Sequence, residues 1–436
     1  MKQKTGQNLY KEAKKLIPGG TQLLSKRPEM FAPEIWPSYY SKAKGSKVFD
    51  LDNNEYIDMS IMGIGANILG YSDDDVDRAV INAVKNGVSS SLNCPEEVEL
   101  AKILTTLHPW ADMVRYARGG GEACAMAVRI ARAKTKRDKV FFSGYHGWYD
   151  WYLAANISNS DMLDGQLMPG LDPNGVPRNL QGTAVPFHFN DIDELKHKSK
   201  GLEKEIAAII VEPARGEDAP KDYLLALKNF SKEIGAVLIF DEITSGFRMC
   251  PGGLHIKYGI NPDIAIFAKS IANGYAMAAV IGNEETMNAA QSTFISSTNW
   301  TERIGPVAAI ATIQKYIESN VADRIIEVGS RVKDVWRDMS KKHGLPIKVS
   351  GLPTLGSFSF STEMNQSMMT FFTVEMLKKG FLGWRQFKPS FAHSDRDIEK
   401  YSDAVDEIFQ KISISDIKDI LKTPEAHTGF SRLTKE

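Results

Sequence analysis

Short apolar runs alternate with helical stretches between about residue 97 and residue 280. The runs are apolar at nearly every position, which is typical of parallel strands covered by helices on both faces of a sheet. The pattern therefore predicts an α/β fold for this region. The predicted strands are Met113–Tyr116, Lys139–Phe142, Ile206–Val211, Ala236–Phe240, Ile264–Ala268 and Ala278–Ile281.

The pattern changes on both sides of this region. Residues 45–58 form two alternating runs around Asp52-Asn53-Asn54, which predicts a hairpin. After Pro306, apolar residues recur at helical spacing with one strand among them. We therefore expect an N-terminal segment (1–60) that joins a smaller domain, a large domain (61–306) and a smaller C-terminal α+β domain (307–436). The predicted C-terminal elements are helices Val307–Glu318, Val321–Lys341, Met368–Lys379 and Asp395–Lys411 and strand Gly356–Ser361.

Composition excludes several classes of partner. The 436 residues include 53 basic and 54 acidic side chains, so the net charge of −1 offers no long-range field that would attract nucleic acid. The longest apolar stretches are much shorter than the roughly 20 residues that a membrane-spanning helix needs, so we expect no membrane partner. The N-terminus lacks the pattern of a signal peptide, which favours a cytoplasmic location.

The cysteines and histidines predict neither disulfides nor metal. Cys94, Cys124 and Cys250 are an odd number at wide spacing, which fits neither a disulfide framework nor a paired zinc motif. The eight histidines are scattered and form no metal-binding motif, so no metal is expected.

Three polar residues stand where predicted strands end. Glu212, Asp241 and Lys269 each follow an apolar run, at nearly even spacing along the chain. Ligands of open α/β sheets gather outside the carboxyl ends of the strands, so this spacing suggests one shared site. The alternative is that each residue caps its own strand in a solvated turn.

Two further segments could bind a ligand. Arg118-Gly-Gly-Gly121 precedes a helix, and glycine N–H groups at a helix start can hold an anion such as phosphate. The segment matches neither nucleotide-binding glycine motif, and a flexible turn is the alternative. Gly144-Tyr-His-Gly-Trp-Tyr-Asp150 follows a predicted strand and brings aromatic rings that could stack on a flat ligand, although core packing is the more frequent role of such rings.

Four ordered motifs together resemble the class III pyridoxal-phosphate-dependent aminotransferases. They are Tyr145-His-Gly147, Val211-Glu-Pro213, Phe240-Asp-Glu-Ile-Thr-Ser-Gly-Phe-Arg248 and the segment 262–274 around Lys269. The resemblance is closest to glutamate-1-semialdehyde 2,1-aminomutase-like aminotransferases and runs from about Tyr10 to Phe409. It implies a type I fold, in which the large domain has a mainly parallel seven-stranded sheet and binds pyridoxal 5′-phosphate. It also implies a homodimer with shared active sites.

The resemblance assigns roles position by position. Lys269 would form the Schiff base with pyridoxal phosphate, Asp241 would pair with the pyridine nitrogen, and Tyr145 would stack on the ring. These three are the implied catalytic residues. The other implied cofactor contacts are Gly120 and Gly121 at the phosphate, Thr301 reaching the phosphate of the neighbouring subunit (with Thr298 as the alternative alignment), Glu212 and Ile243 near the ring, and His146 as a supporting residue.

Some segments differ from the aminomutase pattern. Arg118-Gly-Gly-Gly121 stands where Asn-Ser-Gly-Thr is usual, and residues 296–306 and 384–387 differ as well. The leading hypothesis is therefore an aminotransferase that moves an amino group between a small-molecule donor and a separate carbonyl acceptor, with sugar-derived and phosphorylated compounds as candidates. Arg27 is a candidate partner for a substrate carboxylate, and a structural role is its alternative.

Two other functions remain open at this stage. The first is glutamate-1-semialdehyde 2,1-aminomutase, which returns the amino group to the same molecule and needs no separate donor. The second belongs to another class, a non-catalytic pyridoxal-phosphate-binding or regulatory protein. The presence of Lys269, Asp241 and Tyr145 argues against the second.

Overall fold

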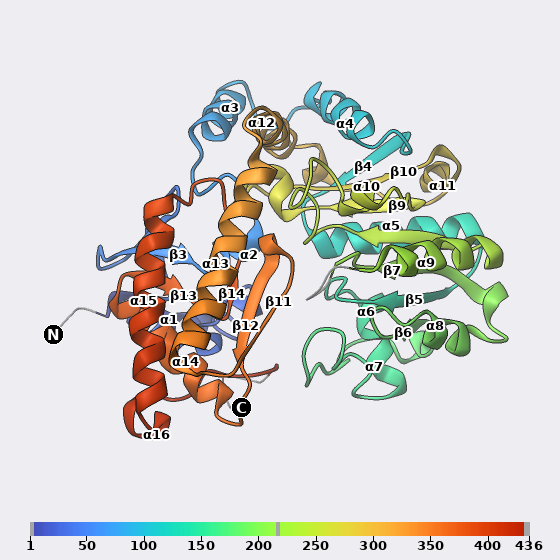
Figure 1. Ribbon diagram of the computed structural model, residues 1–436. Coiled ribbons are helices and arrows are strands. Elements are labelled where there is room, and N and C mark those ends of the chain that lie inside the picture. The colour runs from blue at the N-terminus through green and yellow to red at the C-terminus, as the bar shows by residue number, and fades with distance from the viewer. Residues whose placement is uncertain (1–3, 215–218, 431–436) are drawn as a thin grey trace. The chain divides into compact units, whose positions relative to one another are not determined.

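The computed structural model describes residues 4–214 and 219–430. Its internal contacts divide the chain into two units. Unit 1 combines Met1–Asp73 with Asp323–Glu436, and unit 2 is the continuous stretch Asp74–Ala322. Figure 1 shows the helices and strands of both units, with labels where there is room. The two ends of the chain thus contribute to one unit, and the middle of the chain forms the other.

Unit 2 is built on a seven-stranded sheet with the order β4-β10-β9-β8-β7-β5-β6. The strands from β9 to β6 pair in parallel, and β10 runs antiparallel to both of its neighbours. The mainly parallel seven-stranded sheet that the resemblance implies is therefore confirmed. The strands are β4 (Met113–Ala117), β5 (Lys139–Ser143), β6 (Ala184–Pro186), β7 (Ile206–Val211), β8 (Val237–Asp241), β9 (Ile264–Phe267) and β10 (Ala278–Gly282).

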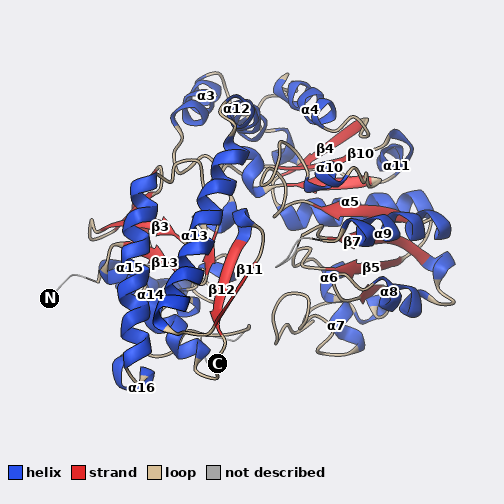
Figure 2. Ribbon diagram, in the orientation of Figure 1, coloured by secondary structure: helices blue, strands red, loops and turns tan. Residues whose placement is uncertain are grey.

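Helices cover both faces of this sheet (Figure 2). Ala208 and Ile210 of β7 share a hydrophobic cluster with α5 (Gly120–Thr135). Ile209 and Val211 of the same strand share another cluster with α9 (Lys221–Ile234). Every residue of β7 is consequently buried, which explains its continuous apolar sequence.

The remaining helices of unit 2 lie before, between and after the strands. They are α3 (Asp74–Lys85), α4 (Glu96–Leu107), α6 (Asp150–Leu153), α7 (Ala155–Ser158), α8 (Ile192–Ser199), α10 (Leu254–Tyr258), α11 (Glu284–Met287) and α12 (Ile304–Glu318). Of the described residues, no helix has both the length and the apolar character to cross a bilayer.

Unit 1 contains two small sheets and helices that pack on a core of aromatic and aliphatic side chains. One sheet has the order β1-β2-β3-β13 and the other β11-β12-β14. The parallel pair β3 and β13 joins Ile57 to Phe381 and so ties the two ends of the chain together. The strands are β1 (Tyr40–Lys44), β2 (Lys47–Asp50), β3 (Glu55–Met59), β11 (Ile347–Ser350), β12 (Gly356–Phe360), β13 (Phe381–Gly383) and β14 (Gln386–Phe387). The helices are α1 (Thr5–Leu16), α2 (Met62–Gly65), α13 (Val321–His343, from Asp323 onward), α14 (Asn365–Lys378), α15 (Asp395–Ile414) and α16 (Ile417–Ile420).

The elements whose bounds were predicted from the pattern of apolar positions are present in the structure. All six strands predicted in the central region are present within one or two residues of their expected bounds, and the hairpin of residues 45–58 is formed by β2 and β3. The four C-terminal helices and the strand between them are also confirmed. The pattern misses β6, which has three residues and ends in Pro186.

Candidate active site

Four parallel strands of unit 2 end at one edge of the sheet, and each carries a predicted site residue there. Asp241 is the last residue of β8, Glu212 directly follows β7, Lys269 lies two residues after β9, and Tyr145 lies two residues after β5. Because these strands are neighbours in the parallel part of the sheet, their carboxyl ends bring the residues to the same side. The structure thus places the four residues at one edge of the sheet, and their roles in a site stay a prediction.

Lys269 presents its amine in this region. The residue is half-buried and adopts a left-handed backbone conformation with φ of 51°. Its Nζ donates a hydrogen bond of 2.7 Å to Thr244 Oγ1. Burial lowers the pKa of the Lys269 amine, although the negative charges of Glu212 and Asp241 act in the opposite direction. A lysine with a lowered pKa has more of the neutral amine that is needed for nucleophilic attack.

Asp241 is held by three neighbours. Its side chain is buried, with 2% of its surface exposed. Oδ2 lies 2.8 Å from His146 Nδ1 and accepts a hydrogen bond from the Cys124 thiol at 3.4 Å. Oδ1 accepts from the backbone N–H of Ile243 at 3.0 Å. These contacts fix the plane of the carboxylate group, so its two oxygen atoms point in defined directions.

His146 is fully buried behind Asp241. Its Nε2 lies 3.2 Å from the Ser143 carbonyl oxygen, so both ring nitrogens face acceptors when Asp241 is ionised. Burial, followed by the charge of Asp241, raises the pKa of Cys124 well above its usual range, so the thiol keeps its proton and donates.

Cys124, His146 and Asp241 form a compact group whose sulfur, nitrogen and oxygen atoms lie within 4.8 Å of one another. The sequence showed no such cluster, because the three residues come from α5, the loop after β5 and the end of β8. In this structure the three side chains satisfy one another by hydrogen bonds around a single carboxylate oxygen.

The Tyr145 ring is positioned by its surroundings. Its backbone N–H donates to Glu212 Oε2 at 3.0 Å, and its ring lies 5.8 Å from the Tyr152 ring at 84°. Burial raises the pKa of the Tyr145 hydroxyl, which therefore stays neutral. With 39% of the residue exposed, the ring can still present a surface to a flat ligand.

The glycine segment forms the beginning of α5. Ala123 is the first residue whose N–H reaches a helix carbonyl, that of Gly119, so the N–H groups of Gly120 and Gly121 precede the helical ladder. A Cβ atom on Gly147, whose φ is 96°, would lie 2.5 Å from Gly121 Cα, and one on Gly120 would lie 2.9 Å from Ile243 Cδ1. The backbone of the segment thus lies close to the Tyr145 loop and to Ile243.

Thr301 lies in a segment that is bound to the glycine segment through the side chain of Arg118. Arg118 donates hydrogen bonds to the carbonyl oxygens of Trp300 at 2.9 Å and Glu302 at 2.8 Å, and its Nε lies 2.9 Å from Glu302 Oε1. Thr301 itself is exposed and donates to the Thr298 carbonyl oxygen at 3.0 Å. Its predicted reach to a neighbouring subunit stays a prediction.

Arg27 belongs to unit 1, where its guanidinium lies 5.6 Å from the centre of the Phe430 ring. Its predicted contact with a substrate carboxylate stays a prediction.

A buried polar network lies behind the site. Glu242, next to Asp241, accepts hydrogen bonds from the backbone N–H and Nδ1 of His255, both at 2.9 Å, and from the Ser245 hydroxyl. Burial alone would raise the pKa of Glu242, but the hydrogen bonds from His255 and Ser245 outweigh it and lower the pKa. His255 Nε2 accepts from Trp110 at 3.0 Å. His255, the main partner of this buried carboxylate, is thus itself held in place.

Sequence reasoning missed two residues that touch the site. Thr244 contacts the Lys269 amine and Cys124 contacts Asp241. The available signals were weak: Thr244 is three residues after Asp241, and Cys124 is one helical turn after Gly120. Neither spacing says where the side chain points until the turn and the helix are placed.

The arrangement fits pyridoxal phosphate part by part. A primary amine suits the aldehyde, a buried and oriented carboxylate suits the pyridine nitrogen, a partly exposed aromatic ring suits the flat heterocycle, and a glycine-rich helix start suits the phosphate.

Comparisons with known proteins identify the family of the chain. The model of the family Aminotransferase class-III matches residues 32–409. The 3-aminobutyryl-CoA aminotransferase of Cloacimonas acidaminovorans is 31% identical over 95% of this chain and 97% of its own. The glutamate-1-semialdehyde 2,1-aminomutase of Thermodesulfovibrio yellowstonii is 32% identical over 94% and 100%. The FumI protein of Sphingopyxis sp. MTA144, solved in its PLP internal aldimine form, superimposes with a TM-score of 0.86 at 23% identity over 97% and 98%.

Proposed function

The chain belongs to the class III aminotransferases, and from this premise we propose that it transfers an amino group between two different molecules, a donor amine and a separate carbonyl acceptor. Transfer of an amino group with pyridoxal phosphate is the chemistry of this family and of this enzyme. What we propose beyond the family is the role of each site residue, the intermolecular course of the transfer and the homodimer. The observation that carries the residue roles is the amine of Lys269 at the same sheet edge as the oriented carboxylate of Asp241.

Pyridoxal phosphate, when bound, supplies an aldehyde that exchanges between amines and a ring that accepts electrons. In the proposed site, Lys269 Nζ would hold the aldehyde, and its free amine would move a proton at the substrate carbon. Asp241 would pair with the pyridine nitrogen and favour its protonated form, and His146 and Cys124 hold Asp241 in place. Tyr145 covers one face of the ring. Gly120 and Gly121 bind the phosphate through backbone N–H groups.

The site also suggests why this chain differs from an aminomutase. Arg118 replaces the usual asparagine before the glycine segment, and Trp300–Glu302 lies in the second segment that departs from the aminomutase pattern. Arg118 binds this second segment through two carbonyl oxygens and the Glu302 carboxylate. The two departures therefore form one local structure beside the phosphate region. This coupling supports a substrate other than glutamate-1-semialdehyde and a separate amino donor.

Lys269 is tested by chemical labelling of the purified holoenzyme. Borohydride reduction followed by peptide mapping is expected to place the cofactor on Lys269 and on no other lysine. Lys269→Ala is expected to lose more than a thousandfold in turnover with any donor. Lys232→Ala, which removes an exposed lysine on α9, serves as the control and should keep the parent rate. A label elsewhere, or full turnover by Lys269→Ala, would refute the assignment.

A donor screen separates intermolecular transfer from isomerisation. Holoenzyme is mixed with glutamate, alanine, β-amino acids and 3-aminoacyl thioesters, and the oxo product of each is measured. The thioesters are included because one relative is named a 3-aminobutyryl-CoA aminotransferase. We expect at least one donor to give its oxo product without any acceptor present. If no donor does so, while the aminated enzyme isomerises glutamate-1-semialdehyde, the enzyme is an aminomutase, as several relatives are named.

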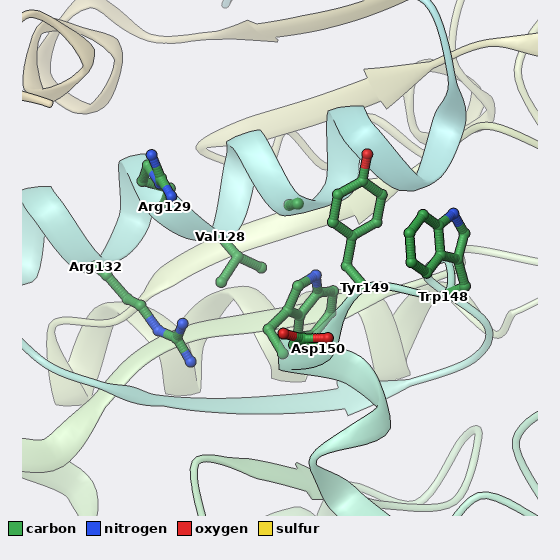
Figure 3. A pocket seen from close by; sticks show the side chains of 8 residues that line it. Val128, Arg129, Arg132, Trp148, Tyr149 and Asp150 are labelled. Carbon is green, nitrogen blue, oxygen red and sulfur yellow. The ribbon is translucent and has the colours of Figure 1, made fainter. Parts of the chain in front are cut away.

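We also propose that the enzyme is a homodimer. Trp148 and Phe294 are 69% and 86% exposed, which is unusual for large apolar residues. Arg129 of α5 donates a hydrogen bond of 3.1 Å to the carbonyl oxygen of Phe294. Arg129 also lines a cavity of about 390 Å³ together with Trp148 and Tyr149 (Figure 3). Thr301, expected to serve a neighbouring subunit, belongs to the same unit. A second copy of the chain is the occupant that would cover these residues.

The cytoplasm remains the proposed compartment. Cys94, Cys124 and Cys250 are all unpaired, as expected for a protein that stays in a reducing environment.

A further inference from the structure

Two hydrogen bonds join the turn that follows β8 to the segment that carries Lys269. Lys269 Nζ donates to Thr244 Oγ1 at 2.7 Å, and the next residue, Ser270, donates its hydroxyl proton to the Gly246 carbonyl oxygen at 2.8 Å. The turn is tightly packed, because a Cβ on Gly246 would lie 2.6 Å from the Glu242 carbonyl oxygen and 2.7 Å from Phe267 Cδ1. Thr244 therefore cannot move away from Lys269 without disturbing the end of β9.

The backbone of Thr244 is held by Arg248. The Nε of Arg248 donates to the Thr244 carbonyl oxygen at 3.3 Å, and Arg248 is almost fully buried, with 1% exposed. The hydroxyl of Thr244 is the only hydrogen-bond partner of Lys269 Nζ within residues 4–214 and 219–430. Asp241 and Glu212 act on the amine through their charge, whereas Thr244 acts on it by direct contact.

We propose that Thr244 is a positioning residue for the reacting lysine, whose hydroxyl holds the Lys269 amine in place whenever that amine is not bonded to the cofactor. This inference rests on the proposed function of Lys269. A threonine suits the task because its β-branched side chain is stiff about χ1. The hydroxyl accepts one N–H of the amine and so limits the directions that the nitrogen lone pair can take.

The hydrogen bond from Lys269 to Thr244 also affects the pKa of the amine. A hydroxyl that accepts from a charged ammonium forms a stronger bond than one that accepts from a neutral amine. Thr244 therefore opposes part of the effect of burial, which lowers the pKa of Lys269. Loss of the hydroxyl should shift the pKa of Lys269 further down while leaving the amine less well oriented. A purely structural threonine would produce neither effect on the amine.

The test measures how fast the apoenzyme attaches pyridoxal phosphate to Lys269. Apoenzyme is mixed with the cofactor over a range of pH, reduced with borohydride at set times, and the label on Lys269 is counted. The plateau rate reports orientation of the amine, and the pH midpoint reports its protonation. We expect Thr244→Val to lower the plateau rate about tenfold and to move the midpoint to lower pH. Turnover should fall by a similar factor, with KM for the donor within about twofold of the parent.

Matched variants separate the hydroxyl from packing. Thr244→Ser keeps the hydroxyl and should retain the parent midpoint and at least half the plateau rate. Thr312→Val removes another buried threonine hydroxyl of unit 2, one that donates to the Ala308 carbonyl oxygen in its own helix, and should behave as the parent. If Thr244→Val folds poorly by circular dichroism, Thr244→Ala removes the same hydroxyl and carries the same expectation.

The outcomes distinguish this inference from the proposed function. If the parent enzyme takes no label at Lys269, the proposed function fails. If the parent is labelled and the variants without the hydroxyl match it in rate and midpoint, only the role of Thr244 is refuted. A loss that Thr244→Ser shares equally would also refute it, because the hydroxyl would then not be the cause.

Discussion

Asp241 shows how neighbouring groups determine the orientation of a single buried side chain. Its carboxylate is buried, but an imidazole, a thiol and a backbone N–H compensate the lost solvation and fix its direction. With these partners the carboxylate is held in one orientation, in which it can pair with one further cation. In the proposed site that cation is the protonated ring nitrogen of the cofactor.

We predict that Asp241→Asn lowers kcat about a hundredfold while the cofactor stays attached to Lys269. Without the carboxylate, the pKa of the cofactor's pyridine nitrogen should fall by roughly two units, so less of it is protonated. The half-reaction with an amino donor is followed by absorbance in a stopped-flow instrument. Asp193→Asn, on the exposed side of α8, is the control. A variant at position 241 that reacts within threefold of the parent would contradict the assigned role.

His108 provides a pH-dependent contribution to stability. It is buried, its Nδ1–H donates to the Leu104 carbonyl oxygen at 2.8 Å and its Nε2 accepts from the Gly253 N–H at 3.0 Å. Burial lowers the pKa of His108 from 6.5 to about 4. Between these values the unfolded chain binds more protons than the folded one, so the free energy of unfolding falls as the pH decreases.

We predict that His108→Gln flattens this dependence. Between pH 7 and pH 5 the parent should lose about 2 kcal/mol of unfolding free energy through His108, and the variant should not lose this part. Urea unfolding at the two pH values measures the difference. His427→Gln, at an exposed histidine, should keep the slope of the parent. Equal slopes for the parent and His108→Gln would show that His108 does not titrate in this way.

Single residues were predictable where the strand pattern itself placed them. Glu212, Asp241 and Lys269 stand at the ends of apolar runs, so their convergence could be expected from the sequence. Thr244 and Cys124 could not, because their importance comes from contacts across 25 and 117 residues of chain. No local spacing encodes such contacts.

At the level of elements, the start of α5 and the loop after β5 meet through two glycines. Gly147 has a φ of 96°, and a side chain there would meet Gly121 Cα at 2.5 Å. The loop carries Tyr145 and His146, so the approach of these two backbones also determines where the aromatic ring and the imidazole lie. The glycine segment and the aromatic loop are therefore one structural unit of the site.

We predict that Gly147→Ala destabilises the apoenzyme by about 2 kcal/mol or more, because alanine is strained at this φ and its Cβ has no room. Gly119→Ala is the matched control, since its φ is −127° and no atom lies within 4 Å of the added Cβ. Urea unfolding compares the two variants with the parent. A cost for Gly119→Ala as large as that for Gly147→Ala would contradict the explanation.

Sequence periodicity predicts long elements better than short ones. The buried strands β7 and β8 and the helix α15 each offer enough consecutive residues for a clear pattern. The strand β6 has only three residues and pairs with β5 alone at the edge of the sheet, so it leaves almost no periodic signal. The antiparallel direction of β10 was not predictable either, because a strand buried on both faces looks the same in both directions.

At the scale of the whole molecule, the exposed residues Trp148 and Phe294 bear on assembly. We predict that the enzyme sediments at twice the 48.4 kDa mass of the chain and that Phe294→Asp weakens the association at least tenfold. Analytical ultracentrifugation over a range of concentrations measures the change. Ile414→Asp, at an exposed residue of unit 1, should leave the association unchanged. A parent enzyme that is monomeric at micromolar concentration would refute the homodimer.

The assignment of residues to the two units has a consequence for synthesis on the ribosome. Unit 2 is one uninterrupted stretch, Asp74–Ala322, so its sheet can close and its core can form as soon as that stretch has emerged. Unit 1 has to wait, because Ile57 of β3 pairs with Phe381 of β13. β3 therefore has β2 beside it but lacks β13 during much of translation, and nascent chains stalled before residue 381 should expose this edge of β3 to chaperones.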